Sequence, residues 1–261
     1  MPVVLLDVEG PVATVTLNRP ERRNAISSQL LRELHQMLEE LDTRGDVSAI
    51  VLTGADPAFC AGLDLTELAD PGSGLAGPAA ASALPRLTKL LIGAVNGPAI
   101  TGGLELALGC DFLVASDRAV FADTHARIGI QPGWGLTVQL PEAIGLRRAR
   151  EMSATGNFVA AQTALTWGLV NHVVPHAELL PVSRRLAADA ASSDQDALRA
   201  LLATYAGGAL ITRAEALRLE AQTHASWHAT GINASQVSER LGGIIERGRS
   251  QQVSGQQPGD R

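Results

Sequence analysis

Two stretches, Pro57-Ala-Phe-Cys-Ala-Gly-Leu-Asp-Leu65 and Asn96-Gly-Pro-Ala-Ile-Thr-Gly-Gly-Leu-Glu-Leu-Ala107, decide the fold of this chain. They follow apolar runs at Ala49–Thr53 and Ile92–Asn96, which are typical of buried strands. Glycine in such a place permits unusual backbone dihedral angles and lets a ligand approach the main chain closely. We therefore expect each strand to leave the sheet through a tight turn that opens a helix.

The chemistry of these two turns follows from the free ends of the helices. The first N–H groups of a helix have no partner within it and carry the positive end of its dipole. Two such groups that converge on one point form an oxyanion hole, which stabilises a carbonyl oxygen as it gains negative charge. Glu105 falls in the first turn of the second expected helix, where its carboxylate can reach the same point. The pattern indicates enolate chemistry.

The chain resembles the enoyl-CoA hydratase/isomerase (crotonase) superfamily, in order and at the family's spacing, from about residue 3 to about residue 250. The resemblance rests on Asn18–Ala25, Ala58–Asp64, Val95–Glu105 with Leu108–Asp111, and Gly129–Gly133, and later on Thr163–Val170 and Glu246–Arg249. It implies an α/β fold, the crotonase-like (ClpP/crotonase) spiral of ββα units, with a C-terminal helical trimerisation segment.

The pattern of strands and helices divides the chain at about residue 200. Alternating helices and strands before that point predict βαβ units and a mostly parallel sheet, so residues 1–199 are the expected crotonase α/β core. Residues 200–249 read as a helical segment, which the resemblance implies assembles the chain into a homotrimer or hexamer. Residues 250–261 are polar and aperiodic, and we expect a disordered tail. A Rossmann domain is disfavoured because no Gly-x-Gly-x-x-Gly follows the first strand.

Composition excludes several classes of partner. The net charge is −6 and the basic residues are scattered, so no basic stripe for nucleic acid is present. No apolar run reaches the eighteen or so residues of a membrane span, and the N-terminus lacks the pattern of a signal peptide. Cys60 and Cys110 cannot form a disulfide framework, and we expect both to pack as small apolar residues. These features favour a cytoplasmic protein.

The resemblance also assigns substrate-binding positions. It places the two oxyanion donors at the backbone amides of Ala61 and Gly102, although glycines that merely permit tight turns are the alternative. Residues around the coenzyme A moiety would be Ala25, Ala61, Gly62, Leu63, Asp64 and Leu65. Coenzyme A enters as part of an acyl-CoA thioester substrate, and no separate cofactor is expected. Arg22 and Arg23 either contact its phosphates or form a solvated turn.

His125 departs from the family pattern. Four residues after Phe121, it occupies the position at which typical family hydratases carry a second catalytic glutamate, whereas Glu105 matches the first. Histidine has an ordinary pKa of about 6.5 and can donate or accept a proton. We expect Glu105 and His125 to be the catalytic pair, with His125 as a pocket-filling or substrate-positioning residue as the alternative. Asp123, two residues away, is a further candidate for the second role.

Gly133 and the pair of His224 and His228 are further candidates for site residues. Gly133, eight residues past His125, matches a backbone amide that orients the reacting water in family hydratases. His224 and His228 have the i, i+4 spacing of metal ligands, but no carboxylate or cysteine cluster completes a site around them, so we expect no metal.

Three functions remain open on this sequence. The leading one is an enoyl-CoA hydratase, a lyase in which Glu105 activates water and His125 or a water supplies the α-proton. The second is another crotonase reaction, an enoyl-CoA isomerase or acyl-CoA hydrolase that depends mainly on Glu105. The third is a non-catalytic acyl-CoA-binding protein that kept the oxyanion hole.

Overall fold

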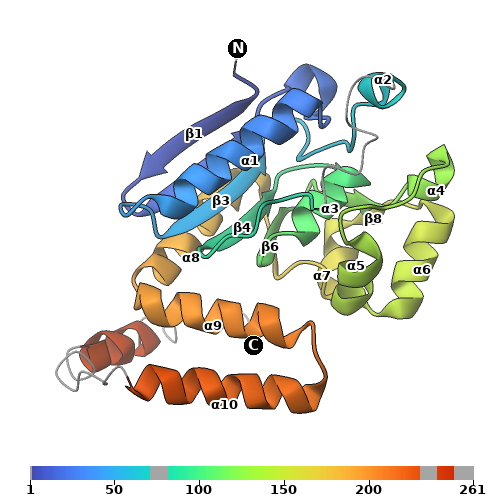
Figure 1. Cartoon of the computed structure of the whole chain (residues 1–261). Helices are drawn as coiled ribbons and strands as arrows, with labels where there is room; N and C mark the ends of the chain where they lie inside the picture. The colour runs from blue at the N-terminus through green and yellow to red at the C-terminus, as the bar shows by residue number, and fades with distance from the viewer. Residues whose placement is uncertain (1, 71–81, 230–239, 250–261) are drawn as a thin grey trace, which may run out of the picture. The chain divides into compact units, whose positions relative to one another are not determined.

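Apolar strands and amphipathic helices alternate along most of the chain and build a six-stranded sheet, shown in a computed structural model that describes residues 2–70, 82–229 and 240–249 (Figure 1). The strands, in spatial order, are β1 (Val4–Glu9), β2 (Val12–Leu17), β3 (Ala49–Gly54), β4 (Leu90–Val95), β6 (Phe112–Ser116) and β9 (His172–Val174). β1 pairs antiparallel with β2, and all the other neighbours pair in parallel. The predicted mostly parallel sheet is confirmed.

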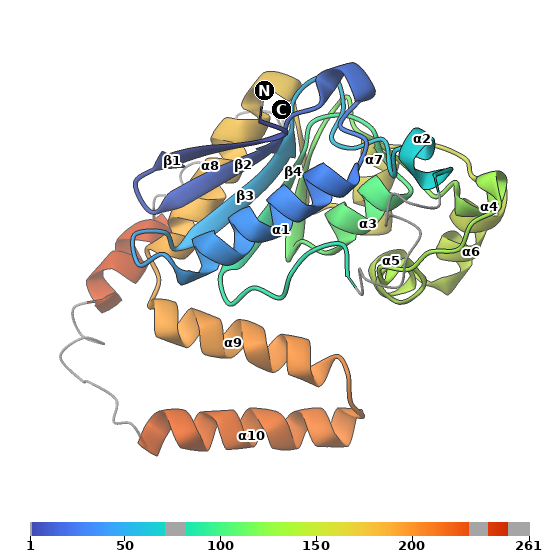
Figure 2. The same ribbon diagram turned by 45° about the horizontal axis from the view of Figure 1, so that its top comes forward.

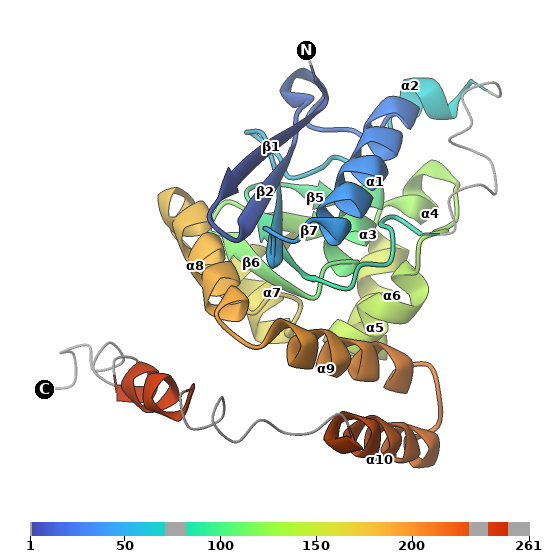
Figure 3. The ribbon, with the colours of Figure 1, turned by 60° about the vertical axis from the view of Figure 1, so that its left-hand side comes forward.

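A second, smaller sheet lies next to the helix that the second glycine stretch opens. Its strands are β5 (Ala99–Ile100), β7 (Val120–Ala122) and β8 (Val159–Ala160). β5 runs parallel to β7, and β7 runs antiparallel to β8. Figure 3 shows β5 and β7 beside α3, and β5 is in contact with that helix.

Helices cover both faces of the main sheet. The helices up to residue 191 are α1 (Ser28–Thr43), α2 (Leu65–Leu68), α3 (Gly102–Leu108), α4 (His125–Ile128), α5 (Leu136–Ile144), α6 (Leu146–Thr155), α7 (Ala161–Trp167) and α8 (Leu179–Ala191), with the 3₁₀ turns η1 (Pro20–Arg22) and η2 (His176–Glu178). Figure 2 shows α1 and α8 on opposite faces, and α8 contacts β2, β3, β4 and β6. Strands β3 and β4, in which every residue is buried, lie between these layers.

Leucines at helical spacing after Ser27, a residue typical of a helix N-cap, predict a helix over Ser28–Thr43, and α1 confirms it to the residue. The Ser27 hydroxyl accepts a hydrogen bond from the Leu30 N–H at 3.1 Å, which caps the first turn. The leucines at helical spacing on its inner face are buried: Leu30, Leu34, Leu38 and Leu41. Their burial fixes the helix against the sheet and, at about 2 kcal/mol for each buried leucine, contributes a large share of its stability.

The expectation that each strand runs directly through a tight turn into a helix was wrong. After β3, the chain crosses residues 55–64 before the short helix α2, which Asp64 caps through the Thr66 N–H at 3.1 Å. After β4, it forms the extra strand β5 before α3 begins at Gly102. The two crossing segments pair instead with each other: Cys60 N–H donates to Pro98 O, and Ile100 N–H donates to Cys60 O, both at 3.0 Å.

The chain divides into two compact units, Met1–Arg199 and Ala200–Arg261. In the second unit, α9 (Gln195–Gly208, of which the last nine residues belong here) and α10 (Arg213–Ala229) run side by side (Figure 1), and residues 240–249 are helical. The Thr204 hydroxyl donates to the Thr223 hydroxyl at 3.4 Å between the two helices. Residues 70–78 are rich in glycine and proline, and the resemblance implies that they form the variable loop of the acyl pocket; most of them lie outside the described residues. The same holds for the expected tail at 250–261 and for part of residues 234–247, whose sequence predicts a helix.

The approach of α3 to the Cys60 segment leaves no room for a side chain at Gly103. A β-carbon there would lie 2.1 Å from the Cys60 carbonyl oxygen, and that oxygen is held by the Ile100 N–H. We therefore expect Gly103→Ala to lower the free energy of unfolding by more than about 2 kcal/mol, because main chain cannot move aside as a flexible side chain can.

Gly45→Ala is the matched control, since a β-carbon there meets nothing within 4 Å. Urea denaturation followed by circular dichroism measures both variants. Equal stability of the two would show that α3 does not require this close approach.

Candidate active site

Two backbone amides lie close together where the crossing segments meet, and one of them differs from the sequence prediction. Ala61 N–H donates to Arg23 O at 3.0 Å, so the predicted donor at Ala61 is wrong. Gly62 O accepts from Ile26 N–H at 2.8 Å. Because N–H and C=O point in opposite directions across a trans peptide, the Leu63 N–H is directed away from residue 26.

Leu63 and Gly102 together provide the pair of donors. A β-carbon at Gly102 would lie 3.5 Å from the Leu63 nitrogen, and one at Gly62 would lie 3.5 Å from the Gly102 nitrogen. Within the described residues, neither the Leu63 nor the Gly102 N–H has a hydrogen-bond partner. The Gly102 N–H is the first of α3, so it carries the positive end of that helix. The arrangement fits an anionic or strongly polarised oxygen.

Thr101, directly before Gly102, has a strained main chain. Its φ of 56° and ψ of −111° lie in a region that favours glycine, and the residue is β-branched. Its hydroxyl lies 2.5 Å from that of Thr124 and accepts from the Thr124 N–H at 3.1 Å. These contacts tie the start of α3 to the segment that leads into His125. Strain of this kind is common at functional sites, where the surrounding structure maintains it.

Glu105 is buried in α3, one turn from Gly102. One carboxylate oxygen, Oε1, accepts from the Trp134 N–H at 2.9 Å. The other, Oε2, lies 3.5 Å from Nε2 of His125. The structure therefore brings together the two residues predicted as the acid–base pair, and places them next to the start of α3.

Asp123 completes a row of three buried side chains. Its Oδ1 lies 2.6 Å from Nδ1 of His125 and also accepts from the His125 main-chain N–H at 3.1 Å. The imidazole thus has a carboxylate on each of its ring nitrogens, Asp123 on Nδ1 and Glu105 on Nε2. Asp123 is not a separate acid–base group exposed to the site, because it is bound to His125.

The charges in this row determine the protonation of His125. Burial lowers its pKa, but the hydrogen bonds and charges of Asp123 and Glu105 outweigh burial and raise the pKa to about 9. Burial would likewise raise the pKa of Asp123, yet hydrogen bonds from His125 and Ser153 hold it below its usual range. At neutral pH the imidazole is therefore protonated between two carboxylates.

The amides of Leu63 and Gly102, which have no partner among the described residues, and the buried side chains of Glu105 and His125 thus belong to one region of the molecule. The family model described as enoyl-CoA hydratase/isomerase matches residues 7–241. The chain belongs to the enoyl-CoA hydratase/isomerase family.

Relatives of several kinds share most of the chain's length. A probable peroxisomal enoyl-CoA hydratase 1 of Arabidopsis thaliana is 35% identical over 247 residues, which cover 92% of this chain and 91% of that protein. The crystal structure of an enoyl-CoA hydratase from Mycobacterium smegmatis is 46% identical, with a TM-score of 0.74, and the match covers 88% of this chain and 96% of that one. A monofunctional enoyl-CoA isomerase from M. smegmatis is 34% identical, with a TM-score of 0.71 and coverage of 83% and 98%. The predicted family and fold class are confirmed.

The residues that the family resemblance assigned to coenzyme A form a paired segment of two parts, Ala25 and Ala61–Leu65, because Ala61 N–H donates to Arg23 O and Ile26 N–H donates to Gly62 O. Arg19 joins its two parts, because its guanidinium donates to Ala25 O at 2.6 Å and pairs with the Asp64 carboxylate at 3.0 Å. Leu65, the first residue of α2, is exposed. Asn24, next to Ala25, joins this segment to the chain that follows β3, because its amide donates to Ala55 O and Ala58 O, both at 2.7 Å.

Several residues of the site were not found from the sequence. Leu63, Thr101 and the Trp134 N–H act through main-chain geometry, which residue types do not report. Asp123 had a signal, because it lies two residues before His125, but its part as the partner of the imidazole was missed. Gly133 is exposed, next to the Trp134 amide that binds Glu105, and its own role stays a prediction.

The remaining candidates show no chemistry of their own. Cys60 and Cys110 are buried, as expected, and burial raises the pKa of the Cys60 thiol to about 12. The centroids of the His224 and His228 rings lie 4.1 Å apart with the ring planes tilted by 53°, and in the described part of the chain no three potential ligands gather into a metal site. None of the helices within residues 2–70, 82–229 and 240–249 has the length and apolar character that crossing a lipid bilayer requires.

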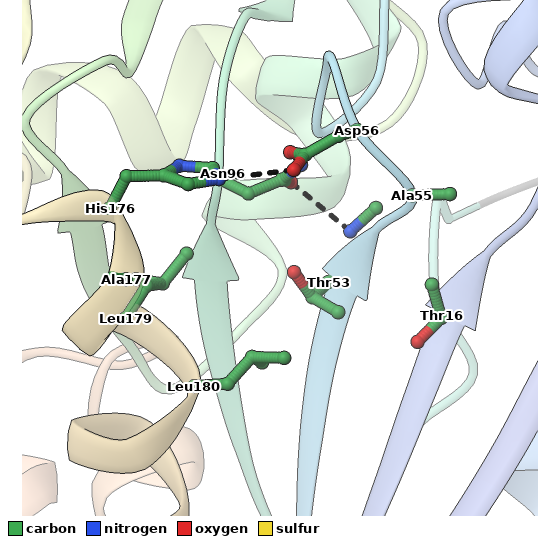
Figure 4. A pocket seen from close by; sticks show the side chains of 10 residues that line it. Thr16, Thr53, Ala55, Asp56, Asn96, His176, Ala177, Leu179 and Leu180 are labelled. Carbon is green, nitrogen blue, oxygen red and sulfur yellow. Dashed lines mark hydrogen bonds and ion pairs between the residues drawn. The ribbon is translucent and has the colours of Figure 1, made fainter.

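A cavity of about 380 Å³ lies away from Glu105, where the carboxyl ends of β2, β3 and β4 meet the start of α8 (Figure 4). Asp56 Oδ2 lies 3.0 Å from Nε2 of His176, and its Oδ1 accepts from the Asn96 amide at 2.9 Å. Asn96 Oδ1 in turn accepts from the Gly54 N–H at 3.2 Å. These side chains satisfy one another, and we interpret the cluster as an anchor for the segment that follows β3.

Proposed function

We propose that this chain is an enoyl-CoA hydratase that adds water to a 2-enoyl-CoA thioester through an enolate. One observation carries the proposal: a buried carboxylate, Glu105, faces a buried imidazole, His125, beside the Leu63 and Gly102 amides, which have no hydrogen-bond partner among the described residues. Hydration needs a base for water, a proton donor for Cα and a place for the developing negative charge. The names of the relatives support this reaction.

In the proposed reaction the thioester carbonyl oxygen binds the Leu63 and Gly102 N–H groups. The Glu105 carboxylate takes a proton from water as the water oxygen bonds to C3. The electrons of the C2=C3 bond move toward the thioester and form the enolate, whose charge the two amides stabilise by roughly 3 kcal/mol for each donor. Nε2–H of His125 then protonates C2. Transfer of the proton from Glu105 to His125 restores the starting state.

Coenzyme A is proposed to lie along Ala25, Gly62 to Leu65 and the exposed turn that carries Arg22 and Arg23, and the chain needs no cofactor beyond this part of its substrate. Gly133 is proposed to orient the reacting water through its amide. The proposed compartment is the cytoplasm.

An isomerase is the second candidate, because a related protein is a monofunctional enoyl-CoA isomerase and Glu105 alone has the means to move a proton between C2 and C4. In that reaction no oxygen from water enters the product. An acyl-CoA hydrolase would release free coenzyme A, and a non-catalytic acyl-CoA-binding protein would leave every thioester unchanged.

The reaction is expected to appear in a panel of 2-enoyl-CoA thioesters of graded chain length, incubated in ¹⁸O-labelled water and analysed by mass spectrometry. Hydration incorporates one labelled oxygen into a 3-hydroxyacyl-CoA. His125→Ala should reduce this rate by roughly 10²–10⁴-fold, the usual span for one acid–base group. Because His125 must be protonated to donate, kcat/KM should fall as pH rises through about 9.

Three results would contradict the hydratase. Double-bond migration without label indicates the isomerase, release of free coenzyme A indicates the hydrolase, and binding of the thioesters without any product indicates the binding protein.

The oxyanion hole is expected to close when a side chain is added at Gly102. A β-carbon there would lie 3.4 Å from the Trp134 ring and 3.5 Å from both Ile26 Cδ1 and Leu63 N, so the longer side chain of Gly102→Leu must occupy the space in front of the amides. We expect acyl-CoA affinity, measured by calorimetry, to fall by at least about tenfold. Gly45→Ala serves as the control, and unchanged affinity of Gly102→Leu would place the carbonyl elsewhere.

A homotrimer or hexamer is the proposed assembly, and α9 and α10 are its proposed contacts. Neither helix has a buried residue in the single chain, and Leu201, Tyr205 and Leu217 are exposed by 51%, 69% and 60%. A helix gains most of its stability by burying an apolar face. Light scattering at micromolar concentration should give a trimer or hexamer, and Tyr205→Asp with Leu217→Glu should reduce its mass. A monomeric wild type would refute the assembly.

A further inference from the structure

We propose that Asp123 is a positioning residue that keeps His125 doubly protonated and directs its Nε2–H toward Glu105 and the substrate. The inference deepens the proposed hydration, since it explains how an imidazole can act where an acid is required. It goes beyond the choice between Asp123 and His125 as the second acid–base group, because the two act as a unit in which only His125 touches the reacting atoms.

The geometry fixes the orientation of the ring. Asp123 Oδ1 accepts both the His125 main-chain N–H at 3.1 Å and Nδ1 at 2.6 Å. The first contact holds the start of α4, and the second holds the plane of the imidazole. Because the carboxylate accepts hydrogen bonds and does not donate them, Nδ1 carries a proton. The opposite nitrogen, Nε2, is thereby turned to Glu105 at 3.5 Å.

The second proton follows from the surroundings of Nε2. If His125 were neutral with its proton on Nδ1, a lone pair on Nε2 would face the Glu105 carboxylate in a buried place, which is repulsive. A proton on Nε2 converts that contact into attraction between opposite charges. The side chains of His125, Asp123 and Glu105 are at most 4% exposed, so water screens these charges little.

Among the described residues, the charges that act on the His125 ring come from Asp123 and Glu105. Glu105 comes from α3, and Asp123 comes from the end of β7. Arg127, on α4 itself, is exposed and turns to the main chain at the end of α6, while Glu151 on α6, the helix that packs against α4, is exposed. The groups that act on His125 are therefore the two carboxylates.

Asp123→Asn tests the charge without removing the shape. The amide oxygen of asparagine can still accept both His125 N–H groups, and its NH₂ can donate to the Ser153 hydroxyl that binds Asp123. Without the negative charge His125 loses protons at lower pH. Because a histidine with the ordinary pKa of about 6.5 is almost entirely neutral at pH 8, kcat should fall there by up to about thirtyfold, but by less than about twofold at pH 6.

A purely structural role predicts a different result, namely an equal loss at both pH values. Asp56→Asn is the matched control, because it removes the carboxylate of another aspartate–histidine pair, with His176. We expect it to leave the pH at which activity falls unchanged. A falling limb near pH 9 in both the wild type and Asp123→Asn would overturn the proposal.

In the His125→Glu variant, Asp123→Asn is expected to change the hydration rate in the opposite direction. In His125→Glu, a carboxylate replaces the imidazole and lies against Asp123, and two carboxylates in one buried site repel each other. Adding Asp123→Asn should then raise the hydration rate by about tenfold or more, whereas the same change lowers it when His125 is present. A loss in both backgrounds would show that Asp123 only supports the fold.

The final measurement does not depend on activity. ¹⁵N NMR of histidine-labelled protein, with His125→Gln to assign the signal, follows ring protonation between pH 6 and 10. We expect wild-type His125 to titrate at least one pH unit above the Asp123→Asn variant. If the two proteins titrate at different pH values but neither hydrates any thioester, the positioning role stands and the proposed function is refuted. If the wild type hydrates thioesters but His125 titrates at the same pH in both proteins, the proposed function stands and the positioning role is refuted.

Discussion

The contact between the Cys60 carbonyl and the first turn of α3 is the constraint on which the rest of the site depends. Cys60 pairs with the chain on both sides of Ala99, and Gly103 approaches its carbonyl more closely than any side chain would allow. This approach brings the start of α3 against the segment that follows β3. As a result, Gly102 and Leu63 are neighbours, and the Glu105 side chain, one turn further along α3, lies in the interior. The apolar sheet provides stability, but this main-chain contact provides the site.

A second link joins the hole to the acid–base groups. The Thr101 and Thr124 hydroxyls connect the residue before Gly102 with the residue before His125. Thr101 holds a main-chain conformation that glycine would adopt more readily, and the strain is offset by these hydrogen bonds. The donors of the hole and the row of Asp123, His125 and Glu105 are therefore positioned by one connected set of contacts, not by independent loops.

Sequence reasoning located the elements whose signal is periodic or chemical. The helix at Ser28–Thr43 followed from leucine spacing and the Ser27 cap. Glu105 was expected in the first turn of a helix, and the family resemblance assigned Glu105 and His125 to the acid–base positions. The amide proposed as the second donor, that of Leu63, was missed by two residues. Which amide is free depends on where residues 23–26 run, because Arg23 takes the Ala61 N–H, and no property of residues 58–64 alone reports that neighbour. The strand β5 was missed because a two-residue strand is too short for any periodicity.

The main-chain nature of the hole divides the site into a fixed and a replaceable part. Only proline removes a main-chain N–H, so the proposed capacity to stabilise an enolate would persist through most substitutions at Leu63 and other side chains near it. The proposed acid–base groups, in contrast, are side chains that a single substitution can replace. A change at position 125 alone would leave Asp123 as a buried carboxylate without the imidazole that now accompanies it. In the proposed site the acid–base chemistry can therefore change at two positions while the main-chain donors stay the same.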